Sequence, residues 1–164
     1  MDTIVYLSLG SNLGDRKGHL RDAIARLRRC GRVTALSSFY ETEPLEFREQ
    51  AWFLNCALGL ETSLEAEPLM HELLAIEKEM GRERVRKKGP RVIDIDILLL
   101  GDSVVETPEV TIPHPGMARR RFVLEPLAEI AADARHPVLN RTVRELLDGL
   151  PGGQVVRKVS SSCP

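Results

Sequence analysis

The chain has 164 residues, of which 43% are hydrophobic and 29% charged, and its formal net charge is −1. This composition is typical of one globular domain, and so small a net charge excludes any partner assignment from bulk electrostatics alone. Three widely spaced cysteines indicate neither a disulfide framework nor a paired-cysteine zinc site, and no apolar run reaches the roughly 18 residues of a membrane span. We therefore expect a monomeric cytoplasmic protein, without a membrane partner, that forms one domain over residues 1–164, with a core at about 3–150 and a loosely held tail at 151–164.

Two kinds of hydrophobic pattern alternate in the first hundred residues. Four segments alternate apolar and polar residues, as strands do, and two repeat apolar residues at helical spacing. In chain order, these predict a strand at 3–9, a helix from Asp15 to Gly31, strands at 32–42 and 53–62, a helix from near Pro68 to Gly81, and a strand at 92–100. The order β-α-β-β-α-β predicts an α+β fold of ferredoxin-like type, in which both helices cover one face of an antiparallel sheet and leave the other face free for a site. Short strands and helices are expected after residue 100.

Two aspartates on the last of these strands carry the sharpest chemical signal. Because strand side chains alternate, Ile93, Ile95, Ile97 and Leu99 are expected to face the helices. Asp94 and Asp96 then project together from the open face, about 7 Å apart. Carboxylates so close repel each other, and Mg²⁺ prefers one or two carboxylates together with phosphate and water oxygens. The alternative is a pair of solvent-facing residues on an amphipathic strand.

A strongly basic segment directly precedes this strand. From Arg82 to Arg91 it reads RERVRKKGPR, with six cations against one carboxylate and a local net charge of +5. Such a loop suits a polyphosphate bound with magnesium, since arginines neutralise phosphate oxygens. A solvated loop or a nucleic-acid patch is the alternative, although no aromatic residues interleave with the charges as single-strand binding would favour, and we expect no nucleic-acid partner. Glu77, in the apolar seam of the preceding helix, requires a partner such as Arg82 or Arg84.

Two further groups of residues can complete such a site. His114, between two prolines and ahead of the cluster 119–121, either serves a phosphate or a proton transfer or is a structural turn residue. Phe53 and Asn55 lie opposite the leucine stripe of their strand, and hence on the open face with the carboxylate pair. A ring beside an amide suits a flat heterocycle. The alternative is a phenylalanine packed under the C-terminal helices and a surface asparagine.

Six segments taken together resemble a known family. In order, they read YLSLGSNLGDR, SSFYETEPL, FLNCALGLET, IEKEMGRER, GPRVIDIDILLLGD and IPHPGMARRRFVLEPLAEI, from residue 6 to about 130. They are similar to the 6-hydroxymethyl-7,8-dihydropterin pyrophosphokinases of folate biosynthesis. The resemblance implies that the chain moves the β,γ-diphosphate of ATP onto the pterin hydroxymethyl oxygen and leaves AMP.

The resemblance also implies a role for each matching residue. Asp94 and Asp96 would bind two Mg²⁺ ions, Arg82 and Arg91 would contact the transferring phosphates, and Arg84, His114, Arg120 and Glu77 would lie on the ATP side. The pterin would be held by Phe53, Phe122, Asn55, Thr42 and Leu45, above a floor of Gly10, Ser11 and Asn12. This chain departs from the family at Lys88, where relatives often have Trp, and in the stretch EFREQAWF before residue 54.

Two other functions share these features. The carboxylate pair also suits a nucleotidyltransferase, which would release pyrophosphate. The basic segment also suits a non-catalytic module that binds nucleic acid.

Overall fold

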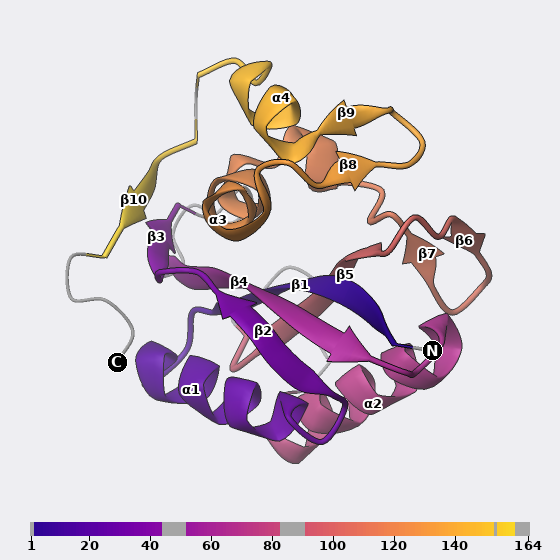
Figure 1. Ribbon diagram of the computed structural model, residues 1–164. Helices are drawn as coiled ribbons and strands as arrows, with labels where there is room; N and C mark the ends of the chain where they lie inside the picture. Colours follow the sequence, from indigo (N-terminus) through magenta and orange to yellow (C-terminus); the bar gives the residue numbers. More distant parts are fainter. Residues whose placement is uncertain (1, 44–51, 83–90, 153, 160–164) are drawn as a thin grey trace.

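A six-stranded antiparallel sheet forms the centre of the structure. The structure is a computed structural model, and it describes residues 2–43, 52–82, 91–152 and 154–159. The elements are β1 (Thr3–Ser11), α1 (Arg16–Leu27), β2 (Arg32–Leu36), β3 (Tyr40–Thr42), β4 (Phe53–Thr62), α2 (Ala66–Glu79), β5 (Asp94–Leu100), β6 (Val105–Glu106), β7 (Thr111–Ile112), a 3₁₀ turn (Met117–Arg119), α3 (Arg121–Ala131), β8 (Arg135–His136), β9 (Arg141–Thr142), α4 (Val143–Asp148) and β10 (Val156–Lys158). Figure 1 shows the sheet between two helical layers, with α1 and α2 below it and α3 and α4 above it.

The strands follow the order β10-β3-β4-β1-β5, and β2 also pairs with β4. The prediction of one strand over 32–42 is wrong, because the chain breaks into β2 and β3 at residues 37–39. Ser37 explains the break: its hydroxyl accepts the Ala57 N–H at 2.8 Å and donates to the Ser38 carbonyl at 2.8 Å. A side chain therefore replaces a backbone partner at this point of the ladder.

The pairing of β1 with β5 contains a bulge. Tyr6 lies opposite Leu99 and Leu7 opposite Ile97, so that Leu98 has no partner of its own in β1. The extra residue reverses the alternation, and the prediction that Leu99 faces α1 and α2 is wrong. Leu99 packs with α3 and α4 instead, as Leu98 does.

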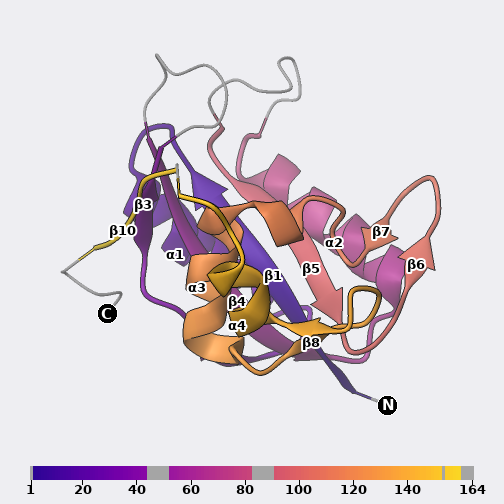
Figure 2. The same ribbon diagram turned by 90° about the horizontal axis from the view of Figure 1, so that it is seen from above.

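Each face of the sheet has its own hydrophobic cluster. The first lies under α1 and α2 and includes Cys30 and Cys56, which confirms the prediction that these cysteines are core residues. The second joins Leu98 and Leu99 to α3 and α4, where Leu124 and Leu127 are fully buried. Figure 2 shows α3 and α4 lying across the sheet from above. The second face, predicted to be free for a site, is free only in part, because an apolar stripe on α3 covers much of it.

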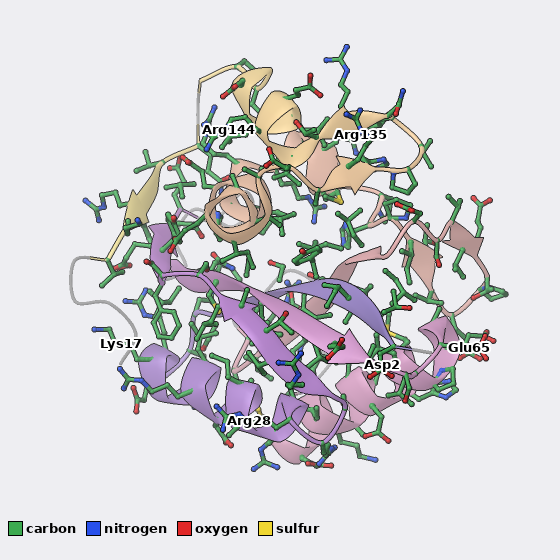
Figure 3. The ribbon with its side chains drawn as sticks, viewed as in Figure 1. Asp2, Lys17, Arg28, Glu65, Arg135 and Arg144 are labelled. Atoms are coloured by element: carbon green, nitrogen blue, oxygen red, sulfur yellow. The ribbon has the colours of Figure 1, made fainter. Side chains whose placement is uncertain are left out.

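The outer surfaces of the two helical layers are charged, as Figure 3 shows for Arg28 and Arg144. Asp15 caps α1 as predicted, because its side chain accepts the Gly18 N–H at 3.1 Å. Across the described ranges, no helix combines the length and apolarity that a membrane crossing needs.

The C-terminal segment is part of the sheet. Val156, Arg157 and Lys158 pair with Thr42, Glu41 and Tyr40 and make β10 an edge strand. The prediction of a loosely held tail is wrong for residues 156–158, because their backbone groups pair with β3, which lies far away in the sequence.

Candidate active site

The register of three strands brings the predicted site residues together. Gly10 of β1 lies opposite Asn55 on β4 and opposite Asp94 on β5. Paired strands lie about 4.8 Å apart, so the amide and the carboxylate project from the same face roughly 10 Å apart. A Cβ atom at Gly10 would come within 2.5 Å of the Asn55 Nδ2 atom. Glycine therefore leaves the space that the asparagine side chain occupies, and the prediction that Asn55 shares a face with Asp94 is confirmed.

Two arginines converge on Asp94. Arg82 places Nη1 at 3.3 Å from one carboxylate oxygen of Asp94, and Arg91 places Nη1 at 3.2 Å from the other. Arg82 also contacts Glu77 at 3.2 Å, and both side chains are almost fully buried. The second Glu77 oxygen accepts the Ile95 N–H at 2.8 Å. The predicted ion pair of Glu77 with Arg82 is confirmed, and it joins α2 to the start of β5.

Asp96 lies two residues further along β5, opposite Ser8. Burial, and then the carboxylates of Asp94 and Glu77, raise the pKa of Asp96 to about 7, although Arg120 and Arg91 act in the opposite direction. The carboxylate pair is thus held together against its own repulsion. A hard divalent cation suits such a donor set.

The described ranges contain no group of three or more His, Cys, Asp or Glu side chains that could hold a metal ion. Two carboxylates completed by phosphate and water oxygens are the arrangement that Mg²⁺ favours. The residues present therefore fit magnesium, while their role as its ligands stays a prediction.

His114 is anchored by two backbone groups. The backbone N–H of His114 donates to the Leu98 carbonyl at 3.0 Å, at the bulge of β5. The ring Nδ1 of His114 accepts the Gly116 N–H at 3.0 Å. An accepting Nδ1 leaves the proton of the neutral ring on Nε2, where it can be donated. Burial, together with the Arg120 charge, lowers the pKa of His114 against the pull of Asp94. His114 is consequently a neutral hydrogen-bond donor near pH 7, and it also fixes the local turn.

Arg120 and Phe122 lie at the start of α3. The guanidinium carbon of Arg120 is 5.9 Å from the centre of the Phe122 ring. The same guanidinium lies over Gly116, where an added Cβ would come within 2.8 Å of it. An added side chain at Gly116 would displace this guanidinium, whose charge acts on both His114 and Asp96.

Asn55 is buried and held in one orientation. Its Oδ1 accepts from the Thr42 hydroxyl at 2.5 Å, its Nδ2 donates to the Leu9 carbonyl at 3.4 Å, and it is 4% exposed. The alternative of a surface asparagine is therefore wrong. Phe53 is half-buried on the same side of Gly10, with Cδ1 3.5 Å from the position of an added Cβ.

The turn after β1 is tied to the segment before β5. Asn12 accepts the Arg91 N–H on Oδ1 at 2.7 Å, and its own N–H donates to the Arg91 carbonyl at 3.1 Å. Ser11 is fully buried, with its hydroxyl 3.4 Å from His19 Nδ1. Asn12 thus ties Arg91 to the turn that follows β1. Arg84, Leu45 and Lys88 lie outside the described residues.

A model of the 7,8-dihydro-6-hydroxymethylpterin-pyrophosphokinase family matches residues 6–132. The chain belongs to this family. Two bacterial 2-amino-4-hydroxy-6-hydroxymethyldihydropteridine pyrophosphokinases are similar along most of their lengths: that of Bacillus subtilis is 47% identical over 132 residues, 79% of each chain. That of Methylorubrum extorquens is 43% identical over 154 residues, which cover 92% of this chain and 96% of that one.

Longer proteins of the family also contain this unit. The folic acid synthesis protein fol1 of Schizosaccharomyces pombe is 42% identical over 160 residues, 96% of this chain but 22% of that protein. The chain thus spans about a fifth of the length of fol1. The crystal structure of wild-type Plasmodium falciparum HPPK-DHPS with pteroate shares the fold, with a TM-score of 0.70 and 18% identity, over 90% of this chain and 42% of that one.

The family match includes every predicted site residue, from Gly10 to Phe122, and ends before β8. Sequence reasoning missed Arg16, which donates to Glu41 at 2.9 Å and to the Trp52 carbonyl at 3.0 Å. It also missed Gly116. Both residues lie in segments that resemble the family, but their contacts could not be predicted, since the partners are distant in sequence or depend on a turn.

Proposed function

We propose that this chain transfers the β,γ-diphosphate of ATP to the hydroxyl of 6-hydroxymethyl-7,8-dihydropterin, giving AMP and the pterin diphosphate ester. One observation carries the proposal: within the family match, the register places Asn55, Gly10 and Asp94 in one row across three strands. An oriented amide for a heterocycle and a charged centre for a polyphosphate then lie on one face, about two strand spacings apart.

The charged end of this row would hold the nucleotide phosphates. Asp94 and Asp96 would bind two Mg²⁺ ions, while Arg82 and Arg91 contact the transferring phosphates. Bound Mg²⁺ would supply neutralisation of phosphate charge and a lower pKa for the acceptor hydroxyl. Arg84, His114, Arg120 and Glu77 would belong to the ATP side, with Glu77 acting through Arg82.

Support for this nucleotide side comes from the contacts around His114 and Arg82. The neutral His114 ring carries its proton on Nε2, as its bond from Gly116 requires, and can donate to an anionic oxygen. Arg82 Nε is buried and has no hydrogen-bond acceptor within the described ranges. A phosphate oxygen would satisfy a guanidinium group of this kind.

The opposite end of the row would hold the dihydropterin. Phe53 and Phe122 would stack on the ring, and Asn55 would bond to its polar edge with the backbone around Thr42 and Leu45. The bond from Thr42 fixes the Asn55 amide before any ligand binds, so little conformational entropy would be lost there. Gly10, Ser11 and Asn12 would form the floor.

The reaction is a displacement at the β-phosphorus of ATP. The hydroxymethyl oxygen forms a bond to the β-phosphorus, the bond from that phosphorus to the bridging oxygen of the α-phosphate breaks, and AMP leaves with that oxygen. The hydroxyl proton passes to solvent. Positioning and charge neutralisation supply most of the rate enhancement in such transfers, so no protein nucleophile is needed.

We further propose that β1 to β5 with α1 and α2 are a ferredoxin-like unit and that the chain acts as one monomeric domain. The sheet order β3-β4-β1-β5 supports the first point. Light scattering during gel filtration would test the second, and a mass near 18.3 kDa is expected.

The nucleotide product tests the proposed reaction. Incubation with Mg-ATP and the hydroxymethyl dihydropterin should release AMP in proportion to pterin consumed, as chromatography of the nucleotides would measure. Omission of the pterin is the control and should give no AMP. Release of ADP would contradict the proposal, and release of pyrophosphate with AMP retained on the product would favour a nucleotidyltransferase.

A further inference from the structure

We propose that Gln154 is a positioning residue for the acceptor side of the site and that it holds the two walls of the dihydropterin pocket at a fixed separation. The inference rests on the proposed function, since it concerns the same acceptor. Gln154 lies beyond the family match, which ends at residue 132.

Both ends of the Gln154 amide are bonded to the protein. Its Oε1 accepts the Phe122 N–H at 3.3 Å, and its Nε2 donates to the Glu43 carbonyl at 2.7 Å. One partner can only donate and the other can only accept, so together they fix the orientation of the amide. A single side chain thus joins the start of α3 to the end of β3.

The bond to Phe122 satisfies a group that the helix itself leaves open. The first N–H groups of a helix have no partner within the helix, and Arg120, at the N-cap of α3, makes no side-chain bond to them. Gln154 takes that role for Phe122. The backbone that directs the Phe122 ring is therefore anchored from outside its own helix.

The bond to Glu43 acts on the other wall. Glu43 directly follows Thr42, whose hydroxyl orients Asn55. The Glu43 N–H donates to the Val155 carbonyl at 3.1 Å, and its carboxylate accepts the Val155 N–H at 2.8 Å. Glu43 is thus joined to residues 154 and 155 by three hydrogen bonds.

Gln154 is itself held by the strand that follows it. β10 pairs with β3, and the Val159 N–H donates to the Phe39 carbonyl at 2.8 Å. The Arg157 guanidinium carbon lies 5.1 Å from the centre of the Trp52 ring, one residue before Phe53. On the other side, Arg121 donates to the carbonyls of residues 150 and 151 at 3.5 and 3.4 Å. The segment is therefore fixed to both walls, and Gln154 lies at the point where it crosses between them.

The test compares Gln154→Met with wild type in the full chain. Methionine has a similar length but lacks the amide donor and acceptor. We expect the KM for the dihydropterin to rise about tenfold, as two lost neutral hydrogen bonds would allow, while the KM for ATP and kcat stay within about twofold. Titration of the dihydropterin by its own fluorescence, in the presence of a non-hydrolysable ATP analogue, should show the same loss of affinity.

Lys158→Ala is the matched control. Lys158 is the last residue of β10, which follows Gln154; its amine is 3.9 Å from Glu129, its side chain is 57% exposed, and the substitution should change neither KM. An unchanged KM for the dihydropterin in Gln154→Met would overturn the inference, as would an equal loss in both KM values. If the wild-type chain forms no AMP, the proposed function fails and the inference fails with it. If the wild type is active and only the variant comparison fails, the inference alone is wrong.

Discussion

The two faces of the central sheet differ in chemistry at the end where β5 begins. The face toward α1 and α2 carries a continuous apolar core, with Val5, Leu7 and Leu9 of β1 all fully buried. The face toward α3 is apolar only where β5 ends, and at the start of β5 it carries Asp94 and Asp96. One face thus stabilises the fold, and the other combines a second core with a charged site.

This difference shows which part of the sheet offsets the unfavourable free energy of burying the site's like charges. Burying like charges on one face is unfavourable, as the raised pKa of Asp96 indicates. The same strands bury large aliphatic side chains on their other face, each of which contributes roughly 1.5 to 3 kcal/mol. We therefore expect substitutions on the two faces to separate activity from stability.

The largest effect is expected at the charged end. Asp96→Asn should lower the rate of AMP formation about 10³-fold, because it removes one of two proposed metal ligands and a charge that acts in the transition state. Steady-state assays at saturating Mg-ATP would measure it. A rate within tenfold of wild type would contradict the assignment of Asp96.

The apolar face should show the opposite behaviour. Leu7→Ala should lower the free energy of unfolding by about 3 kcal/mol, since it leaves a cavity under α1 and α2. Urea denaturation would measure the change. The rate per folded molecule should stay close to that of wild type, and a large loss of kcat in fully folded protein would show that the two faces are not separable in this way.

A smaller effect is expected at the middle of the row. Gly10→Ala would place a methyl group within 2.5 Å of Asn55 Nδ2 and displace that amide. The KM for the dihydropterin should rise about tenfold, as for a shift of a positioned group by a fraction of an ångström. Gly152→Ala is the matched control, because nothing lies within 4 Å of an added Cβ there. Equal behaviour of the two variants would mean that Gly10 plays no part in the pocket.

The smallest effect concerns stability and pH in chelator-treated protein. The pKa of Asp96 is about 7 in the fold, against about 3.9 in an unfolded chain. The folded state therefore binds more protons between these values, and its stability should fall as the pH rises from about 4 to 7. Asp96→Asn should weaken this dependence and raise Tm at pH 8 by a few °C.

The exposed Asp148→Asn serves as the control for this stability measurement and should leave Tm unchanged. Thermal unfolding followed by circular dichroism at several pH values would measure both variants. A Tm that falls in Asp96→Asn would indicate that the Asp96 charge stabilises the fold.

The sequence by itself determined the elements that depend on local patterns. Period-two alternation predicted β4 with the bounds that the structure has. Asp15 predicted where α1 begins. Alternation also placed Asn55, Asp94 and Asp96 on one face, since side chains along a strand take opposite sides by geometry alone. Six short segments of the sequence resembled the family, and the match over residues 6–132 confirmed that resemblance.

Only the tertiary structure decided the features that depend on distant partners. The bulge at Leu98 turned Leu99 to the other face of the sheet. The carbonyl of Leu98 accepts the backbone N–H of His114. Ser37 ended β2 by bonding to Ala57 of another strand, and β10 formed because β3 offered it an edge. The physical reason is common to all three. Hydrogen bonds and packing between residues far apart in the chain outweigh local preference, and the free energy of such contacts exists only once the sheet has formed.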